Sequence, residues 1–115
     1  METYQNLQLE ALGDATRRAI VARLAEGPLA VGELAAGFPI SRPAISQHLR
    51  VLKTAGLVVD RAAGTRRMYE LNPMGFAALR DYLDAFWNHA LAAFQRRVDN
   101  EADLGRPSTP HEEKR

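Results

Sequence analysis

The stretch SRPAISQHLRVLKTAGLV, residues 41–58, decides the fold because it combines an amphipathic helix with a defined end. An α-helix turns once in about 3.6 residues, and apolar residues recur at that period to form a core-facing arc. The arc comprises Ala44, Ile45, Leu49, Val51 and Leu52. Gly56 follows it and predicts a left-handed residue that closes the helix. One side of this helix is therefore an anchor, and the other side needs a separate explanation.

The side opposite the apolar arc contains no acidic residue. It comprises Arg42, Ser46, Gln47, Arg50, Lys53 and Thr54. A merely solvated helix face usually mixes charges of both signs. Ser and Gln can hydrogen-bond base edges in a major groove, whereas Arg and Lys can contact guanine or phosphate. This face favours nucleic-acid contact, with a solvated surface as the alternative.

Two details of this helix stay open. Pro43 suits a first helical turn but disfavours helical geometry at Arg42, so either Ser41 or Arg42 is the N-cap. His48 lies beside the apolar arc, and its position favours a packed structural histidine over a DNA contact.

Three shorter helices are expected upstream. The first covers about residues 7–12. The second follows Asp14 as its N-cap and ends near Gly27. The third has apolar residues at helical spacing over residues 31–38. A short helix, a tight turn and the longer basic helix therefore follow one another along the chain.

A basic hairpin is expected downstream. Two short β-rich runs, LVVDRAA and RRMYEL, flank Gly64 and Thr65, and this arrangement predicts a turn between two strands. Arg61, Arg66 and Arg67 give the hairpin its charge. A protruding basic hairpin can reach phosphate or the minor groove beside the helix. The alternative is a solvated hairpin with scattered arginines.

A long helix is expected to close the chain. Asn72 and Pro73 form a typical helix start, and the helix is expected to run to about Arg97. Residues 99–115 are polar and contain two prolines, which predicts a disordered tail. We therefore expect one domain over residues 1–98, followed by this tail.

Composition restricts the class of protein further. A length of 115 residues with 46% hydrophobic and 25% charged residues suits a single globular domain. No apolar run approaches the length of a membrane span, and the N-terminus lacks the pattern of a secretory signal. We expect a cytoplasmic protein with no membrane partner. The absence of cysteine excludes disulfides and thiolate metal ligands.

The charge is clustered rather than abundant. Residues 41–67 hold six basic residues and one acid, a net charge of +5, and the remaining residues carry −4, which together give the +1 of the whole chain. A basic cluster of this kind is the electrostatic pattern expected of a surface that contacts phosphate.

The order of helix, turn, basic helix, hairpin and long closing helix resembles the winged helix-turn-helix of the ArsR/SmtB family of bacterial repressors. The resemblance rests on ALGDATRRAIVARLAEGPLAVGELA (11–35), SRPAISQHLRVLKTAGLV (41–58) and RAAGTRRMYEL (61–71), and it extends over about residues 7–94. It implies a mainly α fold of order α-α-α-α-β-β-α with a β-hairpin wing. It also implies a homodimer that binds a palindromic operator in double-stranded DNA and represses transcription, with autoregulation as one expected mode.

The resemblance and the helix face together select the expected DNA contacts. These are Arg42, Pro43, Ser46, Gln47, Arg50, Lys53, Arg66 and Arg67. Among them, Ser46 and Gln47 are favoured for bases, whereas Arg50 and Lys53 are favoured for phosphate.

The last helix is too apolar for a lone surface helix. A dimer interface is favoured, with core packing and an apolar effector pocket as alternatives. The expected interface residues, two of them on the first helix that the resemblance places at the dimer, are Leu7, Leu9, Leu79, Leu83, Phe86, Trp87, Ala90 and Phe94.

The chain is similar to a cysteine-free branch of the family without the usual metal sites. Its third helix has no thiol, and Asp81, Asp84 and His89 on the last helix make an incomplete ligand set. We therefore expect no metal and no cofactor, while the nature of any effector stays open.

Other function classes are the alternatives to a DNA-binding regulator. A winged helix can bind a protein partner in place of DNA, and a regulator can carry an unrecognised metal or small-molecule site. The sequence has no Gly-rich phosphate loop, nucleophile elbow or zinc-protease motif, and its three histidines lie in separate elements. We therefore expect that the protein is not an enzyme.

Overall fold

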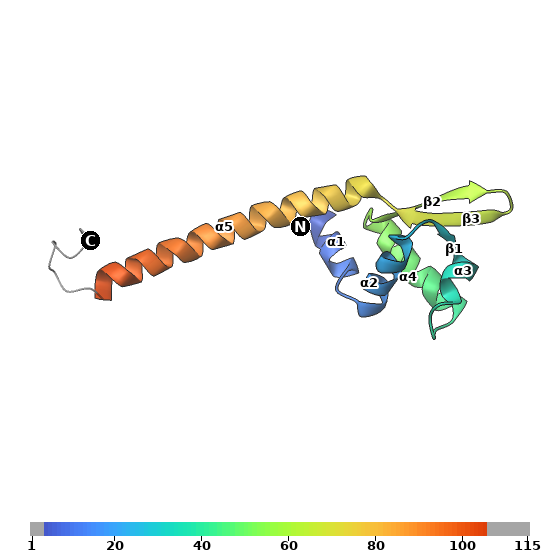
Figure 1. Ribbon diagram of the computed structural model, residues 1–115, viewed down its shortest axis with the longest axis horizontal. Coiled ribbons are helices and arrows are strands. Elements are labelled where there is room, and N and C mark those ends of the chain that lie inside the picture. Colours follow the sequence, from blue (N-terminus) through green and yellow to red (C-terminus); the bar gives the residue numbers. More distant parts are fainter. Residues whose placement is uncertain (1–3, 106–115) are drawn as a thin grey trace. The chain divides into compact units, whose positions relative to one another are not determined.

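The computed structural model describes residues 4–105, and its elements are labelled in Figure 1. In chain order they are α1 (Tyr4–Ala11), α2 (Ala15–Leu24), β1 (Leu29–Ala30), α3 (Val31–Ala35), α4 (Arg42–Thr54), β2 (Val58–Ala63), β3 (Arg66–Leu71) and α5 (Pro73–Gly105). The predicted fold class, mainly α with a β-hairpin wing, is confirmed. The chain divides into two units, Met1–Asp81 and Tyr82–Arg115.

The core of the first unit gathers side chains from α1 to α4, the start of β2 and the first turns of α5. It comprises Ala11, Ile20, Leu24, Leu34, Ile45, Leu49, Leu52, Ala55, Leu57, Val58 and Leu79. Full burial of a leucine or isoleucine side chain contributes about 1.5–3 kcal/mol. The large aliphatic residues of this cluster therefore supply most of what holds the short helices together.

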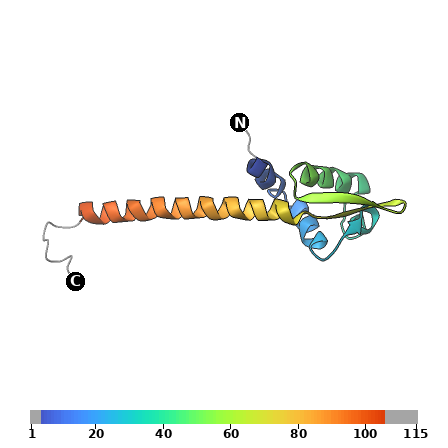
Figure 2. The ribbon, with the colours of Figure 1, turned by 90° about the horizontal axis from the view of Figure 1, so that it is seen from above.

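The sheet has three strands in the order β1-β3-β2, all antiparallel. The hairpin pairs Val58 with Leu71 at its base and Ala63 with Arg66 at its tip. The turn contains Gly64 at φ 66°, a left-handed conformation that favours glycine. The tip of the hairpin extends past the helices of this unit in two perpendicular views (Figure 1 and Figure 2). The predicted wing is therefore present and protrudes.

Strand β1 was not predicted from the sequence. Its two residues pair with the middle of β3, Leu29 with Tyr69 and Ala30 with Met68. A strand of two residues is too short to show the alternation by which strands are recognised. Its pairing attaches the wing to the segment that leads into α3.

Two helix ends also differ from expectation. Helix α3 ends at Ala35, and residues 36–38 continue in tight turns in which Gly37 N and Phe38 N each donate over 3.1 Å to the carbonyl three residues earlier. Helix α5 continues past Arg97 to Gly105. Side chains four residues apart support these last turns, because Gln95 donates to Asp99 and Arg97 pairs with Glu101. Residues 99–105 of the expected disordered tail are therefore helical, and residues 106–115 lie outside the described part of the chain.

The C-terminal end of α4 and the start of α5 meet in a close backbone contact. Gly56 closes α4 at φ 77°, as predicted, and its carbonyl accepts from Asn72 Nδ2 at 2.9 Å. A Cβ on Gly75 would collide with that same carbonyl oxygen. The carbonyl of Gly75 accepts in turn from the buried Nε2 of Gln8 at 3.2 Å. Helix α1, the end of α4 and the first turn of α5 are thus joined at one point.

Across residues 4–105, no helix has both the length and the apolar content that a membrane crossing requires.

Candidate nucleic-acid interface

Helix α4 is held so that its basic side faces outward. Ser41 is the N-cap, because its Oγ accepts from Ala44 N at 3.2 Å, which decides between the two caps left open by the sequence. Ile45, Leu49 and Leu52 are each at most 1% exposed. The predicted contact residues on this helix, Arg42, Pro43, Ser46, Gln47, Arg50 and Lys53, are all exposed. The orientation of the helix agrees with the apolar arc at Ile45, Leu49 and Leu52, but Val51, which was predicted to face the core, is 39% exposed.

His48 belongs to the packed side of α4. The residue is half-buried, and its Nδ1 lies 3.3 Å from Arg17 Nη1 on α2. This contact agrees with the structural role that the sequence favoured. Arg17 also donates from Nε to Ala11 O at 2.7 Å, so the same guanidinium connects α4 with the C-terminal end of α1.

Two of the three arginines of the wing, Arg66 and Arg67, are each paired with an acid from another element. Arg66 Nη1 lies 3.3 Å from Glu33 Oε2 on α3. The other oxygen of Glu33 accepts from Ala30 N at 2.9 Å, and this backbone hydrogen bond, followed by the charge of Arg66, holds the pKa of Glu33 below its ordinary value. Glu33 therefore ties Arg66 to the N-terminal end of α3.

Asp60 on β2 holds two cations at once. Its Oδ1 lies 2.8 Å from Lys53 Nζ on α4, and its Oδ2 lies 2.8 Å from Arg67 Nε on β3. The carboxylate is only 8% exposed, whereas the side chains of Lys53 and Arg67 are 54% and 57% exposed. Hydrogen bonds from Lys53 first and Arg67 second lower the pKa of Asp60, and Asp60 in turn raises the pKa of Arg67.

Neither Asp60 nor Glu33 was predicted as a site residue. One indication for Asp60 was available, since it is the only acid in residues 41–67. The sequence contains no comparable indication for Glu33. In contrast, no carboxylate within residues 4–105 pairs with Arg42 or Arg50. The exposed face thus combines two unpaired arginines on α4 with three cations that are held in place.

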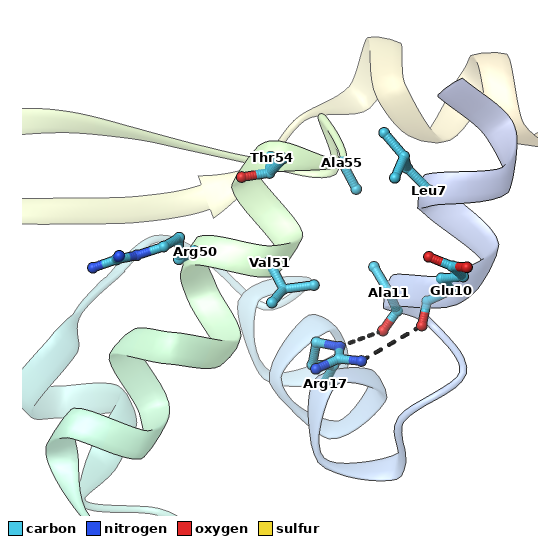
Figure 3. A pocket seen from close by; sticks show the side chains of 8 residues that line it. All are labelled: Leu7, Glu10, Ala11, Arg17, Arg50, Val51, Thr54 and Ala55. Carbon is cyan, nitrogen blue, oxygen red and sulfur yellow. Dashed lines mark hydrogen bonds between the residues drawn. The ribbon is translucent and has the colours of Figure 1, made fainter. Parts of the chain in front are cut away.

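A pocket of about 300 Å³ lies between α1, α2 and α4. Figure 3 shows the eight residues that line it, with Leu7, Ala11, Val51 and Ala55 as the apolar ones. Its polar lining comes from Glu10, Arg17, Arg50 and Thr54, and Arg17 reaches from α2 to the carbonyl oxygens of Glu10 and Ala11 (Figure 3). Because Arg50 and Thr54 are on α4, this pocket borders the helix that carries the basic face.

The predicted interface residues do not all share one environment. Leu79 is 5% exposed and belongs to the core of the first unit, so its side chain is not available to a partner. Leu7 packs against that core, and Leu9 is 39% exposed. In the second unit, the apolar side chains of α5 remain uncovered: Leu83, Phe86, Trp87, Leu91 and Phe94 are 41–61% exposed, and Ala90 is half-buried. Leu91 belongs to this stripe by its exposure and was not among the predicted interface residues.

Within residues 4–105, no three histidine, aspartate or glutamate side chains are close enough to hold a metal ion.

The chain is similar to known bacterial regulators. A model of the family described as "bacterial regulatory protein, arsR family" matches residues 14–59. The HTH-type transcriptional regulator Rv2034 of Mycobacterium tuberculosis is 61% identical over 105 residues, covering 90% of this chain and 98% of that protein. The arsenical resistance operon repressor of Escherichia coli is 37% identical over 90 residues, 77% of each chain.

Solved structures show the same architecture. One is the solution structure of the homodimeric winged helix-turn-helix DNA-binding domain, fragment 1–100, of Mb0332 from Mycobacterium bovis, described as a possible ArsR-family transcriptional regulator. It is 30% identical to this chain, with a TM-score of 0.57 over 71% of this chain and 76% of that one.

Proposed function

Since the chain belongs to the ArsR family of bacterial transcriptional regulators, which are not enzymes, we propose that it is a homodimeric repressor that reads a palindromic operator with α4 and the wing. The observation that carries this proposal is the exposed, acid-free face of α4 beside a wing whose Arg66 and Arg67 are exposed and each paired with an acid. A bacterial repressor of this kind acts in the cytoplasm, where the chromosome lies.

The chemistry of the face supports a division of roles. Ser46 and Gln47 are exposed in the middle of α4 and can donate to and accept from base edges. Arg50 and Lys53 lie one turn further along, and Arg66 and Arg67 lie on the wing, where they can contact backbone phosphate. Phosphate contacts position the protein, and the two neutral side chains discriminate between sequences.

A homodimer is supported by the uncovered stripe of α5 and by the homodimeric Mb0332 domain. Two copies related by a two-fold axis present two copies of α4, which read half-sites about one DNA turn, roughly 34 Å, apart. A two-fold symmetric reader favours a palindromic site. The repressor named among the relatives supports repression as the outcome of binding.

The test is a selection of bound duplexes from a random pool, followed by footprinting of the selected site and of the gene's own upstream region. We expect a palindrome, bound with strong salt dependence. Its presence upstream of the chain's own gene would establish autoregulation. Failure to select any sequence would refute the proposal and favour a winged helix that binds a protein partner.

Two substitutions test the division of roles. Ser46→Ala and Gln47→Ala should each weaken operator binding by roughly 1–3 kcal/mol and leave binding to random DNA unchanged. Gln95→Ala, an exposed glutamine of α5, serves as the matched control and should change neither. An equal loss on operator and random DNA would contradict base reading by these residues.

The pocket between α1, α2 and α4 supports one effector class, a small amphipathic carboxylate. Its volume is at the lower limit of small-ligand sites, and its lining offers an apolar floor with two arginines against one carboxylate. Octanoate should shift the NMR signals of Leu7 and Val51 and weaken operator binding, and octanol, which lacks the charge, should do so less. Unchanged signals with octanoate would exclude this class.

A further inference from the structure

We propose that Asp60 is a positioning residue for DNA recognition, whose nearly buried carboxylate holds Lys53 of α4 and Arg67 of the wing ready for phosphate contact. This inference rests on the proposed DNA-binding function and adds a residue from outside the basic face. It assigns a role in binding to the single acid of residues 41–67.

The geometry is that of a bridge between three elements. Each oxygen of Asp60 takes one cation, Oδ1 the Nζ of Lys53 and Oδ2 the Nε of Arg67, both at 2.8 Å. Asp60 itself is fixed on β2, where it pairs with Tyr69 of β3. Helix α4 and the two strands of the wing, β2 and β3, therefore meet at one carboxylate.

The bridge leaves both cations able to bind DNA. A lysine ammonium has three donors, and Asp60 takes one of them. Arg67 uses its Nε, so the edge formed by Nη1 and Nη2 remains available as a two-pronged donor for phosphate. More than half of each cationic side chain is exposed, although the carboxylate is covered. Asp60 therefore orients these charges and does not hide them.

The pairing of Arg66 differs from the Asp60 bridge in the exposure of the acid and in the number of cations that the acid binds. Its partner Glu33 is 45% exposed and takes one arginine only, and the same arginine also contacts Met68 Sδ at 3.8 Å. An exposed single pair of this kind holds its side chains weakly. The covered bridge at Asp60 is the stronger constraint on side-chain geometry.

Two consequences for binding follow. Lysine and arginine side chains lose considerable rotamer freedom when they are fixed against a partner, and the bridge imposes that loss before DNA arrives. The carboxylate also offsets the repulsion between two like charges held close together. Removal of the charge on Asp60 should therefore weaken operator binding even though it makes the protein more basic.

The experiment compares Asp60→Asn with the wild-type protein on the selected operator and on random duplex DNA, over a range of salt concentrations. Asparagine has nearly the same shape as aspartate, but its side chain is uncharged and has only one acceptor oxygen. Its NH₂ group would face either Lys53 or Arg67, neither of which can accept a hydrogen bond from it. Glu26→Gln is the control, because Glu26 is exposed and its replacement by glutamine changes the net charge by the same amount as Asp60→Asn does. Thermal melting of each variant reports whether it folds.

We expect Asp60→Asn to bind the operator about tenfold less tightly. Binding to random DNA should be unchanged or tighter, because the net charge rises by one. The salt dependence on the operator should become shallower by about one phosphate contact. In a Lys53→Ala, Arg67→Ala background, Asp60→Asn should have no further effect on affinity.

An unchanged operator affinity in Asp60→Asn would overturn the inference. An operator affinity that rises in parallel with the affinity for random DNA would also overturn it, and would show that the charge of Asp60 opposes DNA binding. If Asp60→Asn fails to melt cooperatively, Arg67→Lys takes its place, since it keeps the charge but loses the free guanidinium edge. Arg67→Lys should also lower operator affinity, and a wild-type affinity would overturn the inference. A wild-type protein that selects no operator would instead refute the proposed function itself.

Discussion

Trp87 gives the sharpest test of dimerisation because it is the only tryptophan in the sequence and lies in the apolar stripe of α5. In the single chain it is 61% exposed. A buried tryptophan removes about 150–250 Å² from water, so a partner that covers this exposed part removes roughly 90–150 Å². At about 25 cal/mol per Å², the gain is about 2–4 kcal/mol for each subunit. Trp87→Ala removes this contribution twice in a symmetric dimer.

At the lower end of that range, the loss is about 4 kcal/mol per dimer, which raises the dissociation constant about a thousandfold. Sedimentation equilibrium measures that constant, and the fluorescence of Trp87 in the wild-type protein should shift to longer wavelength on dilution as the interface opens. Leu104→Ala is the control, since Leu104 is 86% exposed at the far end of the same helix and should not matter. A dimer built on this stripe would be refuted if the Trp87→Ala protein sediments as the wild type does and the emission of the wild-type protein does not change on dilution.

Three further predictions concern the stability of the first unit. Leu49→Ala, at a side chain that is 1% exposed, should lower the free energy of unfolding by about 3 kcal/mol in urea titrations, whereas Val51→Ala on the exposed edge of the same helix should cost less than about 1 kcal/mol. Gly75→Ala should destabilise by about 1–3 kcal/mol because the new Cβ meets the carbonyl of Gly56; a stabilised variant, as helix propensity alone predicts, would disprove that contact. Finally, the pKa of Asp60 is lowered in the folded chain, so its stabilising effect exists above its ordinary pKa of 3.8 and disappears as the pH falls through the folded value. The difference in the free energy of unfolding between wild type and Asp60→Asn should thus shrink below about pH 5. A difference that stays constant down to pH 2 would contradict a stabilising role for the charged carboxylate.

The parts of the fold that depend on local chemistry could be predicted from the sequence. Asp14 caps α2 by accepting from Arg17 N at 3.0 Å, and Gly56 and Gly64 adopt the left-handed conformations that their positions required. The burial of Ile45, Leu49 and Leu52 follows from their period alone. In each case the physical cause lies within a few residues of its effect.

The features that were missed depend on residues far apart in the chain. Strand β1 exists because β3 offers it a partner about 40 residues later, and a two-residue strand has no pattern of its own. Leu79 shares its period with the exposed residues of α5, yet the core of the first unit covers it, and periodicity does not say which molecule covers a side chain. The pairing of Asp60 with Lys53 and Arg67 requires three elements to be in place before the acid meets its partners.

Helix length was underestimated for a different reason. The residues after Arg97 are polar, and polar residues suggest a tail, but Gln95, Asp99 and Glu101 make contacts along the helix that need no apolar face. At residues 99–105 the spacing of the polar side chains, rather than their composition, indicates the helix.

The pairing of β1 with β3 has a consequence for engineering new sequence preferences. A wing hairpin transplanted from a relative would bring β2 and β3 but would leave Leu29 and Ala30 facing a foreign strand. The graft boundary should therefore not be drawn at the ends of the hairpin. The interchangeable module is the hairpin together with the segment that leads into α3, two pieces of chain that a chimera has to exchange at the same time.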